Sequence, residues 1–303
     1  MTSPLPFLEV DMKRALILLL LCAPAWSAND FSADPNVLAL MNFDIADEDN
    51  PSLGYWHDSS GNDQDFSGDV DSNTVDFQQG DGCAEFDCMG KYAVGNYINR
   101  ADVDLSADWP IKQTFAGTVK FSFCAWFKPD LLPTSTTGDQ IRALFGKYNS
   151  NAGERGIALT EFWDDSKACL RFYKGWDSGG SQELTLHTTA LVSGQWYHIG
   201  LTYDDTDHSV VMRLWDETAG TVTAVTDTHT NAMDPNGCSK PVYIGQLQLT
   251  AGQYYEFDGL MDEMVFFNDI LTADEIDEIR LRTYGAPAAT GTSNWWWRRR
   301  HNN

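Results

Sequence analysis

The sequence predicts an all-β protein, built as an antiparallel sandwich or barrel with one short helix near its C-terminal end. Between residues 37 and 284, short runs of alternating apolar and polar residues are separated by turn clusters rich in Gly, Asp, Asn and Ser. This pattern is typical of such folds. No internal repeat and no linker rich in Pro and Ser divides the span. With 303 residues, 43% of them hydrophobic, the chain is long enough for one large β domain.

The strands are predicted where apolar residues alternate with polar ones, because that period buries one face of a strand. They are residues 37–43, 91–98, 121–128, 141–147, 156–162, 168–173, 183–186, 196–203, 209–216, 221–226, 241–246 and 255–267. The helix is predicted from Thr272, since Thr272 and Glu275 have the spacing of a capping box. Ile276 and Ile279 give this helix an apolar edge.

The charge of the chain restricts its partners. Forty-four acidic residues against 20 basic ones give a formal charge of −24. Such a surface repels nucleic acid and anionic lipid, because both bind to positively charged surfaces. It suits hard cations, neutral ligands or high ionic strength, and a solvated acidic coat explains it equally well.

The N-terminal residues have the pattern of a secretory signal peptide, predicted over residues 1–28. Lys13 and Arg14 precede a short apolar run, which is followed by small residues. The run is shorter than the roughly 20 apolar residues that span a bilayer, and no other long apolar segment predicts a membrane span. We therefore expect a secreted protein, extracellular or periplasmic, with one domain over residues 29–285. Residues 286–303 are expected to be a disordered tail. The alternative is that its Trp and Arg residues contact membranes or acidic partners.

Export makes disulfides an expectation, because they form in oxidising compartments. Without the signal peptide the chain keeps Cys83, Cys88, Cys124, Cys169 and Cys238. Spacing alone leaves the connectivity open. The preferred pairing is Cys83 with Cys88 as a loop staple and Cys124 with Cys169 between strands, which leaves Cys238 free. A zinc site is not expected, since no His lies near the close Cys pair.

Several motifs, in a consistent order over residues 37–284, resemble the laminin G-like domains of the concanavalin A-like superfamily. They are Asn-Phe-Asp at residues 42–44, Asp-Ser-Ser-Gly-Asn at 58–62, Ala-Glu-Phe-Asp at 84–87, Phe-Ser-Phe-Cys-Ala-Trp-Phe-Lys-Pro at 121–129, Trp-Tyr-His at 196–198, Val-Tyr-Ile-Gly at 242–245 and Phe-Asp-Gly-Leu-Met-Asp-Glu at 257–263. The resemblance implies a jelly roll of two antiparallel sheets packed face to face, usually around a structural calcium. It also implies binding of glycans or proteins, although a related branch contains glycoside hydrolases. Fold alone does not choose among these functions.

A calcium site is the first candidate. Alternation in the last strand places Asp262 on the same face as Met264 and Phe266, and in the first strand it places Asp44 with Leu40. A buried carboxylate is costly unless it is paired or bound to a metal. If the two terminal strands are neighbours, as in the related folds, Asp44 and Asp262 converge on one Ca²⁺, and backbone carbonyls complete its shell. The alternative is that Asp262 is capped by the backbone or an arginine at the strand end.

A second oxygen-rich loop contains Asp58, Asn62, Asp63 and Asp65. Its spacing is only loosely that of a calcium loop, because it lacks the glycine and glutamate positions of the helix–loop–helix site. The alternative is a solvated turn held by side-chain hydrogen bonds to the backbone.

Aromatic residues beside acids in loops are the candidates for carbohydrate binding. They are Trp163 with Asp164, and Trp176 with Asp177. Sugar rings stack their C–H faces on aromatic rings, while their hydroxyls need hydrogen-bond acceptors. Ordinary edge packing is the alternative for each of these residues.

Catalysis finds little support in the sequence. A glycosidase needs two carboxylates at a defined separation, and the hydrolase branch carries them as alternating acids on one strand, a pattern that no strand here has. No Gly-x-Ser-x-Gly elbow is present either. The preferred interpretation is a secreted, calcium-stabilised module that binds a glycan or an extracellular protein without catalysis. The alternatives are a glycoside hydrolase with an unrecognised carboxylate pair, and a structural or adhesive protein without a small-molecule site.

Overall fold

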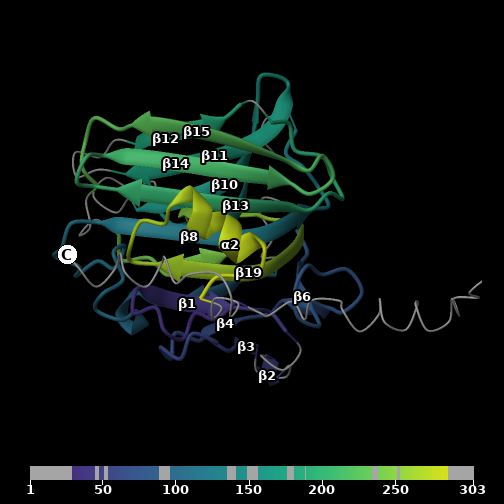
Figure 1. Cartoon of the computed structure of the whole chain (residues 1–303), viewed down its shortest axis with the longest axis horizontal. Coiled ribbons are helices and arrows are strands. Elements are labelled where there is room, and N and C mark those ends of the chain that lie inside the picture. Colours follow the sequence, from purple (N-terminus) through teal and green to yellow (C-terminus); the bar gives the residue numbers. More distant parts are fainter. Residues whose placement is uncertain are drawn as a thin grey trace, which may run out of the picture.

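The computed structural model describes residues 29–44, 48–50, 54–88, 96–134, 141–148, 156–175, 181–187, 189–233, 238–250 and 253–285. These segments form two sheets that pack face to face, with one short helix on the outer side of one sheet (Figure 1). The predicted all-β sandwich with a C-terminal helix is therefore confirmed. The predicted signal peptide and the predicted tail lie outside the described residues.

The first sheet, called sheet A, has the order β15-β14-β13-β8-β19-β6-β5, and β1 also pairs with β19. Its strands are β1 (Val37–Met41), β5 (Asp71–Asn73), β6 (Cys83–Phe86), β8 (Lys120–Pro129), β13 (Tyr197–Asp204), β14 (Ser209–Asp216), β15 (Thr221–Thr228) and β19 (Gly259–Phe267). The first and last strands of the domain are thus hydrogen-bonded neighbours.

The second sheet, called sheet B, has the order β12-β11-β10-β9-β16-β7-β4-β3-β2, and a hairpin of β17 and β18 joins it at β9. Its strands are β2 (Glu48–Asn50), β3 (Tyr55–Trp56), β4 (Phe66–Gly68), β7 (Ile98–Arg100), β9 (Ile141–Lys147), β10 (Ile157–Asp164), β11 (Lys167–Gly175), β12 (Ser181–Leu186), β16 (Val242–Ile244), β17 (Gln246–Thr250) and β18 (Gln253–Glu256).

The predicted strands agree with the structure over most of their length, and residues 141–147 and 209–216 have the predicted bounds. The short strands β2 to β6 were not predicted, because two to four residues are too few to show alternation. The predicted strand 255–267 is divided into β18 and β19. Gly259 lies at the division with a φ of +142°, and a Cβ there would lie 2.1 Å from the carbonyl oxygen of Lys128.

Phenylalanine rings fill the space between the two sheets. Phe123 of β8 lies 4.4 Å from Phe145 of β9 and 5.1 Å from Phe266 of β19, measured between ring centroids. All three side chains are fully buried. Tilted and edge-on aromatic contacts of this kind add to the stabilisation that burial alone provides, so these rings connect the centres of the two sheets.

The helix α2 (Ala273–Arg280) begins at the predicted capping box. The Thr272 hydroxyl accepts a hydrogen bond from Glu275 N, and the Glu275 carboxylate accepts one from Thr272 N. Ile276 and Ile279 pack on the outer face of sheet A against Val265, and Figure 1 shows α2 lying across this sheet. In the described part of the chain, no helix is long and apolar enough to cross a bilayer.

The predicted disulfides are wrong for this structure, in which Cys83, Cys88, Cys124 and Cys169 are free thiols. Cys124 lies on the outer face of sheet A, under α2. Cys169 alternates with two core residues of β11 and so faces outward from sheet B. The two thiols therefore lie on opposite outer faces of the sandwich and point away from each other, which no disulfide can bridge. Cys83 begins the extended strand β6, which carries the chain about 10 Å away before Cys88.

Gly200 of β13 allows α2 to pack closely on sheet A, since a Cβ there would lie 2.5 Å from Ile276 Cγ2. We predict that Gly200→Ala lowers the free energy of unfolding by about 1–3 kcal/mol, the usual cost of overpacking. In a chain that also carries Ile276→Ala, the same change should cost markedly less, because the clashing methyl groups are gone. Urea unfolding of the parent, the two single variants and the double variant measures this. Additive costs would contradict the proposed contact.

Candidate functional site

A β-bulge in β19 determines where Asp262 points. Asp262 pairs with Trp126 of β8, but the register then shifts and Val265 pairs with Cys124. Glu263 occupies the bulge with a φ of 48°. As a result Asp262 lies on the outer side of the strand, while Met264 belongs to the core between the sheets. The prediction that Asp262 shares a face with Met264 and Phe266 is therefore wrong, because it assumed uninterrupted alternation.

The prediction that the first and last strands are neighbours is confirmed. β1 pairs antiparallel with β19, with Met41 opposite Met264. The chain then turns at Phe43, whose φ is 59°, and this turn leads directly to Asp44. Asp44 and Asp262 lie close enough for the charge of Asp44 to raise the pKa of Asp262. The structure thus brings together the two carboxylates that were predicted to converge.

A loop at residues 78–81 holds both carboxylates through backbone N–H groups. Gln78 N and Gln79 N both donate to Asp262 Oδ2 at 2.8 Å, and Asp81 N donates to Asp44 Oδ1 at 2.7 Å. Gly80 has a φ of +64°, and a Cβ there would lie 1.7 Å from Asp44 Oδ1. Only glycine fits this close approach. Sequence reasoning missed the loop, and Gly80 was its only visible signal.

Burial makes the charged forms of these acids costly. Burial, opposed by the loop amides and reinforced by the charge of Asp44, raises the pKa of Asp262 to about 7. Burial together with Asp262 and Asp44 raises the pKa of Glu263 to about 8. Asp262 Oδ1 is buried and has no hydrogen-bond partner. The charges of Asp44 and Asp262 add to the cost of ionising Glu263, and the charge of Arg282 partly offsets that cost.

The donor chemistry here fits a hard cation. Ca²⁺ takes six to eight oxygen ligands in loose geometry, and Asp44, Asp262 and Glu263 offer only oxygen atoms. Within the described ranges, however, no group of three or more His, Cys, Asp or Glu side chains has the arrangement of a metal site. Carbonyl or solvent oxygens would have to complete the shell around Asp44 and Asp262. The calcium site accordingly stays a prediction.

The oxygen-rich loop around Asp58 is a structural turn. Asp58 Oδ1 accepts hydrogen bonds from Leu40 N at 2.8 Å and Ser60 N at 2.9 Å. Its Oδ2 accepts from Ser60 Oγ at 2.8 Å and Gln64 N at 2.9 Å. Asp58 is buried, and its carboxylate ties the loop to β1 through Leu40 N, while the other three hydrogen bonds hold the loop itself together. The structure agrees with the alternative interpretation of this loop.

The predicted sugar-binding pair of β10 does not form one surface. Trp163 packs against the core between the sheets, whereas Asp164 is on the opposite side of the strand. The Asp164 carboxylate forms an ion pair with Arg171 at 2.8 Å, and Arg171 also contacts Glu183 at 3.0 Å. The strand alternation that separates Trp163 from Asp164 was visible in the sequence, but both residues were assigned to a loop. Trp176 and Asp177 lie outside the described residues.

The outer face of sheet B carries a row of tyrosines instead. Cross-strand partners in consecutive strands form one row across this sheet: Tyr55, Ser67, Asn99, Tyr243, Gly146, Ala158, Tyr173 and Glu183. Each tyrosine alternates with core residues of its strand, so its ring lies on the outer face. No described helix covers this face, since α2 packs on sheet A.

Further tyrosines extend the row into two aromatic patches. Tyr97 and Tyr243 have ring centroids 5.6 Å apart, and Tyr148 and Tyr173 have centroids 6.4 Å apart. Leu247 of the β17–β18 hairpin lies over Gly146, between the two patches. All four rings are partly exposed. The face thus offers aromatic rings, hydroxyls, an amide and a carboxylate along one line.

A family model for the concanavalin A-like lectin/glucanases superfamily (Laminin_G_3) matches residues 102–277, more than half of the chain. The chain belongs to this superfamily. The predicted resemblance is therefore confirmed. Asp262 lies inside the matched region, whereas Asp44 and the loop that holds it precede the match.

Solved structures share the fold at low sequence identity. The binding domain of botulinum neurotoxin serotype D/C VPI 5993 is 11% identical with a TM-score of 0.51, over 81% of this chain and 51% of the toxin chain. The W1252A mutant of HCR D/C VPI 5995 is 12% identical with a TM-score of 0.53, over 83% and 52%. The CBM40 of the Ruminococcus gnavus IT-sialidase, bound to α2,3-sialyllactose, is 13% identical with a TM-score of 0.42, over 54% and 83%.

This chain therefore spans about half of each toxin structure. Identities this low establish the fold alone. Among curated protein sequences, no match is found.

The acidic cluster should make the metal-free protein less stable as pH rises. Folded Asp262 and Glu263 keep their protons up to about pH 7 and 8, whereas unfolded carboxyls lose them near pH 4. Between about pH 4 and pH 8 the native state binds more protons than the unfolded state. The free energy of unfolding is therefore greatest near pH 4 and decreases as the pH rises toward 8. Asp262→Asn should flatten the profile.

Thermal unfolding in a chelator, from about pH 4 to pH 8, measures this dependence. Asp227→Asn serves as the control, because Asp227 is exposed on β15 and should leave the profile unchanged. Identical pH profiles for the parent and Asp262→Asn would contradict the raised pKa values.

Proposed function

We propose that this member of the superfamily is a non-catalytic glycan-binding module whose ligand lies on the tyrosine-bearing outer face of sheet B. The observation that carries the proposal is the cross-strand row containing Tyr55, Tyr243 and Tyr173. Tyr55 is 50% exposed, although a large aromatic side chain normally gains by burial. Partly exposed rings beside polar groups suit sugars, which stack on rings and hydrogen-bond to hydroxyls and acids.

The chemistry around the row supports a polar, uncharged ligand. Asn99 and Ser67 lie beside Tyr243 in the row, and Glu183 lies beside Tyr173. Amide, hydroxyl and carboxylate groups can all accept hydrogen bonds from sugar hydroxyls. The net charge of −24 disfavours nucleic acid and anionic membranes as partners. An extracellular protein is the other ligand class that the fold accommodates.

Calcium has a structural part in this proposal. Bound between Asp44 and Asp262, it would neutralise buried carboxylates that otherwise repel each other, and so stabilise the junction of the first and last strands. Since the junction belongs to sheet A and the tyrosines to sheet B, the ion supports the fold and does not contact the glycan. We further propose that the protein acts outside the cytoplasm, in line with the signal-like residues before the domain.

A glycan array tests the binding proposal. We expect the protein to retain a defined set of glycans, and Tyr173→Ala or Tyr243→Ala to weaken binding by about tenfold or more, the loss of roughly 1.4 kcal/mol. Comparing the two variants shows which aromatic patch holds the ligand. Val192→Ala is the control, because Val192 is 46% exposed and lies outside the row.

If the protein retains no glycan, or if all three variants bind glycans equally well, the proposed binding site is wrong. Release of reducing sugar from a polysaccharide panel would instead favour the glycoside hydrolase alternative.

A calcium titration followed by thermal unfolding tests the structural part. Saturating Ca²⁺ should raise the melting temperature, since a ligand at 100 times its dissociation constant stabilises by about 2.7 kcal/mol. Asp262→Ala should abolish the increase, because it removes a central ligand. If the affinity and the melting temperature are the same with Asp262→Ala as with the parent, the calcium site is excluded.

A further inference from the structure

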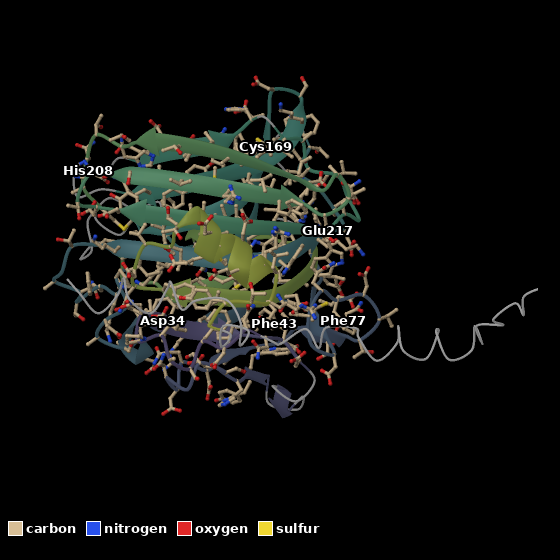
Figure 2. All side chains as sticks on the ribbon, viewed as in Figure 1. Asp34, Phe43, Phe77, Cys169, His208 and Glu217 are labelled. Atoms are coloured by element: carbon tan, nitrogen blue, oxygen red, sulfur yellow. The ribbon has the colours of Figure 1, made fainter. Side chains whose placement is uncertain are left out.

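A pocket of about 410 Å³ lies on the outer side of sheet A, at the C-terminal end of α2. It is lined by Gln78, Gln79, Trp126, Glu217, Arg280, Leu281 and Arg282. Figure 2 shows Phe77, which precedes Gln78, and Glu217 at the same end of the molecule. The volume is within the usual range for small-molecule sites, about 300–1,000 Å³. The tyrosine row lies on the other sheet, so this pocket is a separate feature.

Trp126, which lines the pocket, belongs to a row of side chains across sheet A. Trp126 of β8 pairs with Asp262 of β19 on one side and with His198 of β13 on the other, and His198 pairs with Trp215 of β14. The Trp126 and His198 rings meet edge to face with centroids 5.1 Å apart. These contacts fix the position of the Trp126 indole, so its N–H group has a defined direction.

Two hydrogen-bond donors in the pocket have no partner. Trp126 Nε1 and Gln79 Nε2 are buried and form no hydrogen bond, although the two residues are only 4% and 3% exposed. Leaving a buried donor unpaired is energetically costly. The Gln79 backbone is held in place by its bond to Asp262, so its side chain is presented from a fixed base. Both groups require an acceptor, which a ligand in the pocket can supply.

The wall formed by the end of α2 is positively charged. Arg280 lies over the Trp215 ring, with its Cζ 3.9 Å from the ring centroid. Arg282 forms no ion pair with any described residue and acts only through its charge, on Glu263. Burial lowers the pKa of His198 to about 3, and the charges of Arg280 and Arg213 act in the same direction.

Acidic groups also lie beside this pocket. Asp262 accepts a hydrogen bond from Gln79 N, and the charge of Arg282 acts on Glu263, so the inference rests on the proposed calcium ion, which would neutralise these acids. Glu217 is exposed and accepts a hydrogen bond from Trp215 Nε1 at 2.6 Å, so it belongs to the rim. Asp277 is paired with Arg213 and Arg280. What remains for a ligand is the Arg282 guanidinium and the two unpaired N–H donors, and all of these groups donate hydrogen bonds.

We propose that this pocket binds a small ligand through a carboxylate group, of the kind that a uronic acid carries. A carboxylate has two acceptor oxygens, which match the Trp126 and Gln79 donors, and a negative charge, which matches Arg282. The hydroxyls of a sugar acid would reach the Glu217 rim. The proposal is independent of glycan binding on sheet B, because it uses other residues on the other sheet.

Titration of the calcium-saturated protein with D-glucuronate tests this inference, with D-glucose as the matched ligand that lacks the carboxylate. The readout is the NMR signal of the Trp126 indole N–H, assigned by its absence in Trp126→Phe. We expect a saturable shift with glucuronate and none with glucose. Gln79→Met and Arg282→Gln should each weaken glucuronate binding by about tenfold, since each removes one donor or charge.

Lys120→Gln is the control, because it lowers the net charge equally from the opposite end of β8, and it should leave the affinity unchanged. An unperturbed indole signal, or equal shifts with glucose and glucuronate, would overturn the proposal. An equal loss of affinity in Lys120→Gln and Arg282→Gln would also overturn it, because it would reveal non-specific attraction. Variants that retain the parent's melting temperature exclude misfolding as the cause.

Discussion

The junction of the first and last strands is the constraint on which this structure depends. Pairing of β1 with β19 closes the domain, and the bulge at Glu263 turns Asp262 toward the turn that carries Asp44. The amides of residues 78–81 hold both carboxylates. Buried like charges are costly unless something compensates them, and this cost raises the pKa of Asp262 to about 7 and that of Glu263 to about 8.

The outer faces of the two sheets differ in what covers them and in which side chains they carry. α2 covers part of sheet A with Ile276 and Ile279, and at its end it creates a polar pocket above Trp126. Sheet B carries no described helix and presents tyrosines across its strands. One fold therefore provides a pocket at the end of α2 on one side and, on the other, an aromatic face that Leu247 divides into two patches.

Local sequence signals predicted the architecture well. Alternation identified most of the long strands, and the Thr272–Glu275 spacing identified α2 because a capping box is entirely local. The convergence of Asp44 and Asp262 followed from the resemblance to laminin G-like domains. These features need only short-range pattern or the order of elements along the chain.

Features that depend on register were not predictable. Nothing in the residues from Leu260 to Phe266 marks the bulge, so the assumed alternation was continued through Glu263 and placed Asp262 on the same face as Met264. Backbone donors such as Gln79 N have no sequence signature. The tyrosine row joins β3, β16 and β11, which are distant in sequence. Trp163 and Asp164 were assigned to a loop, whereas β10 extends to Asp164 and places the two side chains on opposite sides of the strand.

A double-mutant cycle between Asp44→Asn and Asp262→Asn, measured by urea unfolding with calcium and with a chelator, tests the junction most directly. With the chelator, neutralising either acid should stabilise the protein, and the second change should then add little because the repulsion is already gone. With calcium, either change should destabilise it, so the coupling reverses sign. Additivity within about 0.5 kcal/mol under both conditions would contradict the account.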